Sequence, residues 1–214
     1  MNTSSRRERE KKARESEILA KAEELFLSKG FDNTSMDDLA KESQYTKRTI
    51  YKYFTSKEDL FYAVILRGYE RLLAMIDSEC STGKTGFEKV KLACQAYYKF
   101  FCKFPELHSL MSLWTTVKAK GNGSDSPFRQ KFMNFNQTMF QRLMSLFEDG
   151  KADGSICSDY DISELSYSSI FLITSFFHMF SHVGNTYTQN FNLDKERFVS
   201  FTINLLTDSF NGHK

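Results

Sequence analysis

The sequence predicts an all-α fold, in which a small N-terminal head of three helices precedes a larger helical domain. Apolar residues recur at helical spacing through most of the chain, and no stretch of any length shows the alternation typical of a strand. Only two prolines and ten glycines interrupt the 214 residues, which also favours helices. The chain is 41% hydrophobic and 15% aromatic, so it can form a substantial core that encloses many rings.

A basic segment opens the chain, and we expect residues 1–15 to form a flexible arm. Between Arg6 and Arg14 there are six lysines and arginines against two glutamates, a local surplus that suits contact with phosphates. The first helix follows the arm and ends at Gly30, a common stop signal. Its apolar positions repeat at helical spacing: Ile18, Leu19, Ala22, Leu25 and Phe26.

Two short helices come next, separated by a break at residues 43–45. Ser35 and Asp38 show the capping-box spacing that begins the first of them. The second carries Ile50 and Phe54 one turn apart, so both can face the core of the head. Two short helices joined by about three residues have the geometry of a helix-turn-helix.

The stretch YTKRTIYKYF, residues 45–54, mixes four aromatic and three cationic side chains, and no acid occurs from Tyr45 to Lys57. The second helix of a helix-turn-helix presents its first residues to base edges in the major groove, where Lys, Arg and Thr can bind. A nearby polyanion explains the missing carboxylates, although composition alone also fits a solvated helix face. We expect base contacts from Thr46, Lys47, Arg48 and Thr49, and further contacts to the DNA from Ser35, Met36, Gln44, Tyr51, Lys52, Tyr53 and Lys57.

The rest of the chain is expected to be helical as well. Ser56 and Asp59 cap the next helix, whose apolar stripe runs from Leu60 to Ile76. Polar stretches that contain glycine mark the breaks, at residues 83–86, 121–127 and 149–161. Further helices are expected over about 87–103, 106–120, 127–148, 162–183 and 194–211.

Aromatic and methionine side chains are frequent in this second part, where a cavity lined by them would suit an apolar or aromatic ligand. For any one of these residues, simple packing in the core is the alternative. His108 and Trp114 are the favoured candidates, because each adds a polar group to a central helix. The full set of candidate ligand-binding residues is Phe101, Phe104, His108, Met111, Trp114, Phe135, Met139, Phe177 and His178.

Several classes of function lack the residues they need. No glycine-rich phosphate loop, nucleophile elbow or zinc-binding helix motif occurs, so we expect neither an enzyme nor a cofactor. His178 and His182 stand four residues apart without a third matching ligand, so we expect no metal site. The four cysteines form no CxxC pair and the N-terminus is charged, which indicates reduced thiols in a cytoplasmic protein. The most apolar run, residues 170–180, is too short to span a membrane.

From Ile18 to Phe61 the chain reads ILAKAEELFLSKGFDNTSMDDLAKESQYTKRTIYKYFTSKEDLF, and this stretch resembles the DNA-binding segment of TetR-type transcriptional regulators. Gln44 is a departure, because the family usually has Gly in this turn, where a positive φ is convenient. Gln44 must therefore accept strain or reshape the turn. A later stretch, DGSICSDYD at residues 153–161, resembles the loop before the family's eighth helix. The matching positions are Ala22, Leu25, Phe26, Gly30, Phe31, Thr34, Ser35, Leu39, Ala40, Thr49, Ile50, Tyr51, Tyr53, Phe54, Ser56, Lys57, Leu60 and Phe61.

The resemblance implies a homodimer with about nine helices per chain, in which the last two helices pair with those of the partner in a four-helix bundle. It also implies a small-molecule pocket among the central helices, and a ligand that moves the fourth helix and releases operator DNA. We therefore expect an arm over residues 1–15, a DNA-binding head over 16–62 and a ligand-binding and dimerisation domain over 63–214. The expected function is a repressor of transcription released by a small, largely apolar or aromatic effector.

Two other functions stay open at the level of sequence. One is a DNA-binding protein of the same fold that acts as an activator, or through a protein partner, without a small-molecule inducer. The other is a helical interaction module whose reading head has degenerated. The sequence does not identify the operator, the regulated genes or the effector.

Overall fold

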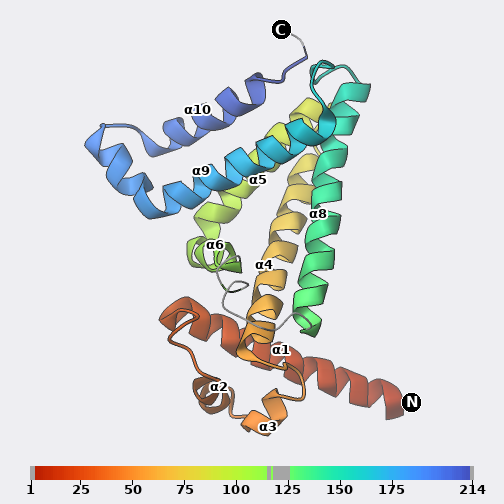
Figure 1. The fold of residues 1–214 in the computed structure, drawn as a ribbon, viewed down its shortest axis with the longest axis vertical. Helices are drawn as coiled ribbons and strands as arrows, with labels where there is room; N and C mark the ends of the chain where they lie inside the picture. The colour runs from red at the N-terminus through yellow and green to blue at the C-terminus, as the bar shows by residue number, and fades with distance from the viewer. Residues whose placement is uncertain (1–2, 115–116, 118–125, 213–214) are drawn as a thin grey trace. The chain divides into compact units, whose positions relative to one another are not determined.

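The computed structural model describes residues 3–114, 117 and 126–212, and the all-α prediction is confirmed over these ranges. Figure 1 shows the helices, and the described residues add one isolated antiparallel bridge between Ile156 and Asn211. No helix in these ranges offers an apolar run sufficient to cross a bilayer. The helices are α1 (Thr3–Lys29), α2 (Met36–Ser43), α3 (Lys47–Ile50), α4 (Lys57–Cys80), α5 (Gly86–Lys103), α6 (Pro105–Ser112), α8 (Pro127–Ala152), α9 (Ile162–Asn190) and α10 (Lys195–Asp208).

The basic N-terminal segment is helical, which corrects the prediction of a flexible arm. Helix α1 begins at Thr3 and runs without interruption to Lys29. From Arg6 to Glu15 the segment consists only of Arg, Lys, Glu and Ala, which are strong helix formers. Arg6 Nε donates to Glu10 Oε1 at 2.9 Å, an ion pair one turn apart that adds local support. The helix ends as predicted, before Gly30 at a φ of 80°.

Aromatic rings from α1, the following loop and α4 build the core of the head. The rings of Phe26, Phe31 and Phe61 contact one another with centroids 5.0 to 6.3 Å apart. Ile50 and Phe54 are fully buried, so the predicted inward face of the second short helix is confirmed. Burial of about five large apolar side chains contributes roughly 1.5–3 kcal/mol each, which fixes the position of α3 on α1 and α4.

The chain divides into two compact units whose boundaries differ from the predicted head and ligand domain. One unit combines residues 1–69 with 110–135, and the other combines residues 70–109 with 136–214. Within the first unit, Phe128 of α8 contacts Phe54 with ring centroids 5.2 Å apart. Local sequence patterns could not predict this division, because it depends on contacts between residues about 70 positions apart.

Helices α5, α9 and α10 pack around the core of the second unit (Figure 1). This core consists of Cys94, Phe101, Ile173, Phe177, Phe180, Val199 and Ile203. Helix α9 extends to Asn190, beyond the predicted end near residue 183. The predicted helix over 106–120 is described as far as Ser112, and most of its remainder and of the loop at 121–127 lie outside the described residues.

Candidate nucleic-acid interface

The turn between α2 and α3 adopts the left-handed backbone conformation that glycine usually supplies. Gln44 has φ 58° and ψ 22°, and its N–H donates to the carbonyl of Lys41 at 3.4 Å. A non-glycine residue in this conformation costs about 1–2 kcal/mol. Gln44 therefore accepts the strain and preserves the turn, so α3 keeps the direction that a helix-turn-helix requires.

Helix α3 begins with a hydroxyl cap. Thr46 Oγ1 accepts a hydrogen bond from the Thr49 N–H at 3.2 Å, and the two threonine hydroxyls lie 3.0 Å apart. The regular helix is only Lys47–Ile50, and a turn continues it until the Phe54 N–H donates to the Ile50 carbonyl at 3.1 Å. The cap uses one side of each threonine hydroxyl, while Lys47 and Arg48 are exposed to solvent at the start of the helix.

Lys47 forms an ion pair that the sequence did not indicate. Its Nζ lies 2.6 Å from Asp37 Oδ1 on α2, and both side chains are exposed. Asp37 is ten residues away on another helix, so only the angle between α2 and α3 brings the two together. In the free protein this carboxylate balances Lys47, and an exposed pair of this kind is worth about 0–1 kcal/mol. A phosphate could replace it at small cost.

Tyr45 anchors the start of α3 to the first helix. Its hydroxyl donates to Glu17 Oε2 on α1 at 2.6 Å, and this bond raises the pKa of the Tyr45 phenol. Tyr45 therefore has a positioning role beside the predicted reading residues. A contact between residues 28 positions apart left no signal in the sequence.

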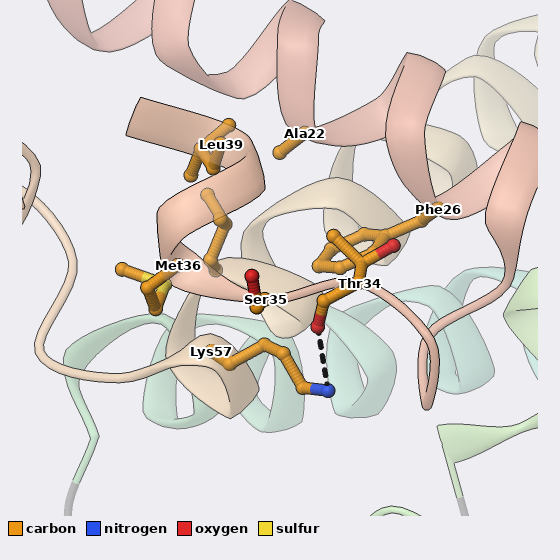
Figure 2. A pocket seen from close by; sticks show the side chains of 8 residues that line it. Ala22, Phe26, Thr34, Ser35, Met36, Leu39 and Lys57 are labelled. Atoms are coloured by element: carbon orange, nitrogen blue, oxygen red, sulfur yellow. Dashed lines mark hydrogen bonds between the residues drawn. The ribbon is translucent and has the colours of Figure 1, made fainter. Parts of the chain in front are cut away.

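In the free protein Lys57 contacts the head itself, and its predicted contact with a phosphate stays a prediction. Its Nζ donates to the carbonyls of Phe31, Asp32 and Thr34 at 2.8, 3.4 and 2.9 Å, and it lies 4.3 Å from the centre of the Phe31 ring. Figure 2 shows the ammonium group pointing at the Thr34 carbonyl. An ammonium group has three N–H donors, so these carbonyls occupy all of them.

The hollow in Figure 2 is a packing seam of the head and too small for a ligand. It holds about 170 Å³ of empty space, part of it open solvent, and leaves no room for a water molecule. Met36 is half-buried and lines this seam, and its predicted contact with DNA stays a prediction. The lining residues are Ala22, Phe26, Thr34, Ser35, Met36, Leu39, Lys57 and Leu60.

The predicted capping box at the start of α2 is confirmed. Ser35 Oγ accepts from the Asp38 N–H at 3.1 Å, and Asp38 Oδ2 accepts from the Ser35 N–H at 2.9 Å and the Ser35 hydroxyl at 2.5 Å. The hydrogen bond from the Ser35 hydroxyl is the main reason that the pKa of Asp38 falls to about 2. Ser35 is exposed at the N-terminus of α2, where free N–H groups favour an anion.

Asp59 joins three segments of the first unit through one buried carboxylate. Its Oδ2 accepts from the N–H and hydroxyl of Thr55 at 2.9 and 3.1 Å, and its Oδ1 accepts from the Phe128 N–H at 2.8 Å. Ser56 Oγ accepts from the Asp59 N–H at 3.1 Å, as the predicted helix cap requires. The sequence indicated this cap, but not the bond to the first turn of α8.

The candidate ligand-binding residues divide between the two units. Phe101, His108 and Phe177 lie together in the second unit, where Phe104 contacts Phe100 and Met139 is buried. In the first unit Met111 is buried, Phe135 is half-buried, and the Trp114 ring lies 5.8 Å from that of Phe132. His178 is exposed and contacts His182, so its side chain does not join the buried cluster.

The buried thiols Cys80 and Cys94 are poor candidates for a reactive site. No group of three or more His, Cys, Asp and Glu side chains in these ranges could hold a metal ion. Burial raises the pKa of the Cys94 thiol to about 12 and also raises that of Cys80. Such thiols stay protonated and are poor nucleophiles.

Sequence comparisons associate the head with known regulators. The sequence profile described as bacterial regulatory proteins, tetR family, matches residues 18–64. The HTH-type transcriptional activator FasR of Mycolicibacterium smegmatis is 26% identical over 87 residues, 41% of this chain and 40% of FasR. The uncharacterized HTH-type transcriptional regulator YfiR of Bacillus subtilis is 37% identical over 67 residues, 31% of this chain and 33% of YfiR. The matches therefore span less than half the length of either relative.

A solved structure extends the similarity of fold to most of the chain. The transcriptional regulator FadR from Bacillus subtilis, crystallised in complex with stearoyl-CoA, aligns with a TM-score of 0.67 at 17% identity. The alignment covers 90% of this chain and 97% of that one. Both chains share an all-α fold.

Proposed function

We propose that this chain, which belongs to the TetR family of bacterial regulatory proteins, is a sequence-specific DNA-binding regulator of transcription. The observation that carries the proposal is the exposed pair Lys47 and Arg48 at the first turn of α3, with no acidic residue from Tyr45 to Lys57. The cap at Thr46 and the bond from Tyr45 to Glu17 support it, because they hold this turn in one position. Base readout needs such preorganised donors.

In the proposed complex α3 enters the major groove and the flanking residues contact the backbone. Lys47 and Arg48 donate to base edges, and Thr49 offers its methyl or hydroxyl group. Tyr51 and Lys52 are exposed and Tyr53 is half-exposed, which suits contacts to phosphates beside the groove. On binding, Lys47 leaves its ion pair with Asp37 and contacts the DNA. The loss of this exposed ion pair costs little free energy.

The proposed active form is a homodimer assembled through α9 and α10. Both helices carry large apolar side chains that are mostly exposed in the single chain, including Phe171 at 70%, Met179 at 66%, Phe201 at 63% and Leu205 at 64%. An apolar surface of this kind is typical of a protein interface. Two heads related by a two-fold axis would then read half-sites about 34–36 Å apart, or a multiple of that spacing.

We further propose that the protein is a repressor released by a small, largely apolar or aromatic effector. The aromatic side chains of the second unit support an apolar ligand, and FadR, similar in fold, was crystallised with stearoyl-CoA. The effector would have to bind the DNA-free spacing of the heads more tightly than the DNA-bound spacing. Helix α4 contributes residues to both units, and we propose that its displacement carries the signal.

The test of DNA recognition begins with selection of bound sequences from random DNA. The double variant Lys47→Ala with Arg48→Ala should then bind the selected site on the order of a hundredfold more weakly, because each base contact is worth roughly 1–3 kcal/mol. Electrophoretic mobility shifts at fixed salt measure the loss. The control, Lys84→Ala with Lys103→Ala, removes two exposed lysines of the second unit and the same charge. Equal binding by the test variant and the parent would refute the assignment of α3.

The second candidate is an activator that needs no small-molecule inducer. It is favoured by the partial match to FasR, whose name describes a transcriptional activator. In vitro transcription from a promoter with the selected site distinguishes the two functions. Added protein lowers transcript levels for a repressor and raises them for an activator.

A further inference from the structure

One nitrogen of a buried histidine has no hydrogen-bond partner. His108 on α6 is 4% exposed, and its Nε2 lies 3.1 Å from the Tyr97 hydroxyl. No group among the described residues lies within hydrogen-bond distance of its Nδ1. An unsatisfied buried polar atom costs roughly 1–3 kcal/mol, so the position needs an explanation beyond packing.

Two aromatic rings of α5 contact this imidazole, and a third ring from α9 contacts both of them. The rings of Tyr97 and Phe101, one turn apart on α5, lie with centroids 5.7 and 5.2 Å from that of His108, each nearly perpendicular to it at 88°. Phe177 of α9 contacts both of these rings at 5.3 and 5.4 Å and is fully buried. Aromatic rings at these distances attract one another, and the same attraction would act on an aromatic ligand in contact with them.

The charge state of His108 limits which chemical groups of a ligand can bind beside it. Burial, with a smaller contribution from His178 and His182, lowers the pKa of His108 to about 4, so the imidazole is neutral near neutral pH. A neutral imidazole has one donor and one acceptor nitrogen, and the Tyr97 hydroxyl uses one of them. Nδ1 is left as a donor or an acceptor, according to the tautomer. A hydroxyl group satisfies either, whereas a charged ligand group would find no opposite charge on His108.

We propose that the effector is a neutral aromatic compound with a hydroxyl group, whose oxygen hydrogen-bonds to Nδ1 of His108 while its ring contacts Tyr97, Phe101 and Phe177. This inference rests on the proposed function, because it specifies the ligand of that regulator. The histidine supplies the preference for the hydroxyl group, and the three rings supply the preference for an aromatic body. Removal of the imidazole therefore abolishes the preference for the hydroxyl group and leaves the preference for an aromatic ring.

Two matched pairs of probes test the proposal in the absence of DNA: phenol against benzene, and 2-naphthol against naphthalene. Isothermal titration of the full chain gives the affinity ratio within each pair for the parent and for His108→Phe. The ratio should fall about tenfold in the variant for at least one pair, because one buried hydrogen bond to the hydroxyl is lost. The control His182→Phe changes an exposed histidine that neighbours His178, and it should leave the ratio unchanged.

A measurement on the unaltered protein guards against misfolding of the variant. Nitrogen-15 NMR of the histidine rings should show a shift at His108 Nδ1 when 2-naphthol is added, and a smaller one with naphthalene. An unchanged ratio in both pairs together with no selective shift overturns the proposal, and so does failure of all four probes to bind. DNA binding is measured separately with the selected site. If the chain binds DNA but shows no preference for the hydroxyl compounds, only the proposed effector is disproved. If it prefers the hydroxyl compounds but does not bind DNA, only the proposed regulatory function is disproved.

Discussion

Lysines of the head that look alike in sequence have opposite roles. Lys52 is exposed beside α3, whereas Lys57 directs all of its donors to carbonyls of the 31–34 loop. Lys57 thereby fixes the segment that leads into α2, and its charge serves the fold. The sequence assigned both residues to phosphates, because composition and spacing do not reveal which way a long side chain turns.

Lys57→Met should lower the free energy of unfolding by about 2 kcal/mol, since hydrogen bonds from a charged donor are worth roughly 1.5–3 kcal/mol. It should leave the salt dependence of DNA binding almost unchanged. Lys52→Met, the matched control, should barely change stability but reduce the slope of log affinity against log salt by about 1. Urea unfolding and salt titrations of DNA binding measure both quantities. The reverse pattern would return Lys57 to the DNA interface.

His108 makes stability depend on pH in a defined window. Its pKa falls from 6.5 in the unfolded chain to about 4 in the fold, so the unfolded state binds more protons between these values. The stabilisation is complete above about pH 6.5 and is lost as the pH falls towards 4, by up to about 3 kcal/mol at 1.36 kcal/mol per unit. In urea unfolding from about pH 7.5 to about pH 4.5, His108→Phe should lose less stability than the parent. Parallel curves would mean that folding leaves the pKa of His108 unchanged.

Among the elements, those with strong local signals were predicted best. The cap at Ser35, the stop at Gly30 and the inward face of Ile50 and Phe54 follow from patterns within a few residues, and all are confirmed. The prediction of a flexible N-terminal arm is wrong because the high helix propensity of residues 6–15 decides their conformation, whereas their positive charge does not. Contacts of Asp37, Glu17 and Asp59 went unpredicted because each joins elements that only the folded chain brings together.

The turn between α2 and α3 predicts a stabilising substitution. Gln44→Gly should raise the free energy of unfolding by about 0.5–1 kcal/mol, because relief of the left-handed strain exceeds the entropy that glycine adds to the unfolded chain. Gly30→Ala, at a φ of 80°, is the converse control and should destabilise by about 1 kcal/mol. Thermal unfolding should show melting temperatures that move in opposite directions. A lower melting temperature for Gln44→Gly would contradict this prediction and would mean that the glutamine side chain stabilises the turn.

For the whole molecule, the exposed apolar side chains of α9 and α10 are expected to determine whether two chains form a dimer. Phe201→Glu with Leu205→Glu adds charge to two apolar positions that are 63% and 64% exposed. The variant should be monomeric by size-exclusion chromatography with light scattering, and should lose most of its affinity for a two-half-site operator. Ser200→Glu with Asn204→Glu adds the same charge to exposed polar positions of α10 and should assemble as the parent does. A parent chain that is itself monomeric would refute this interface.

The division of the chain into interleaved units has a consequence for anyone who wishes to exchange reading heads between regulators of this kind. A chimaera joined after residue 69 would transplant α1 to α3 and the first part of α4 but leave behind residues 110–135, which belong to the same unit. Phe54 would then lose the ring of Phe128, and the carboxylate of Asp59 would lose the donor at the start of α8. A working graft must therefore carry two separate gene segments, or redesign the surface that the second one covers.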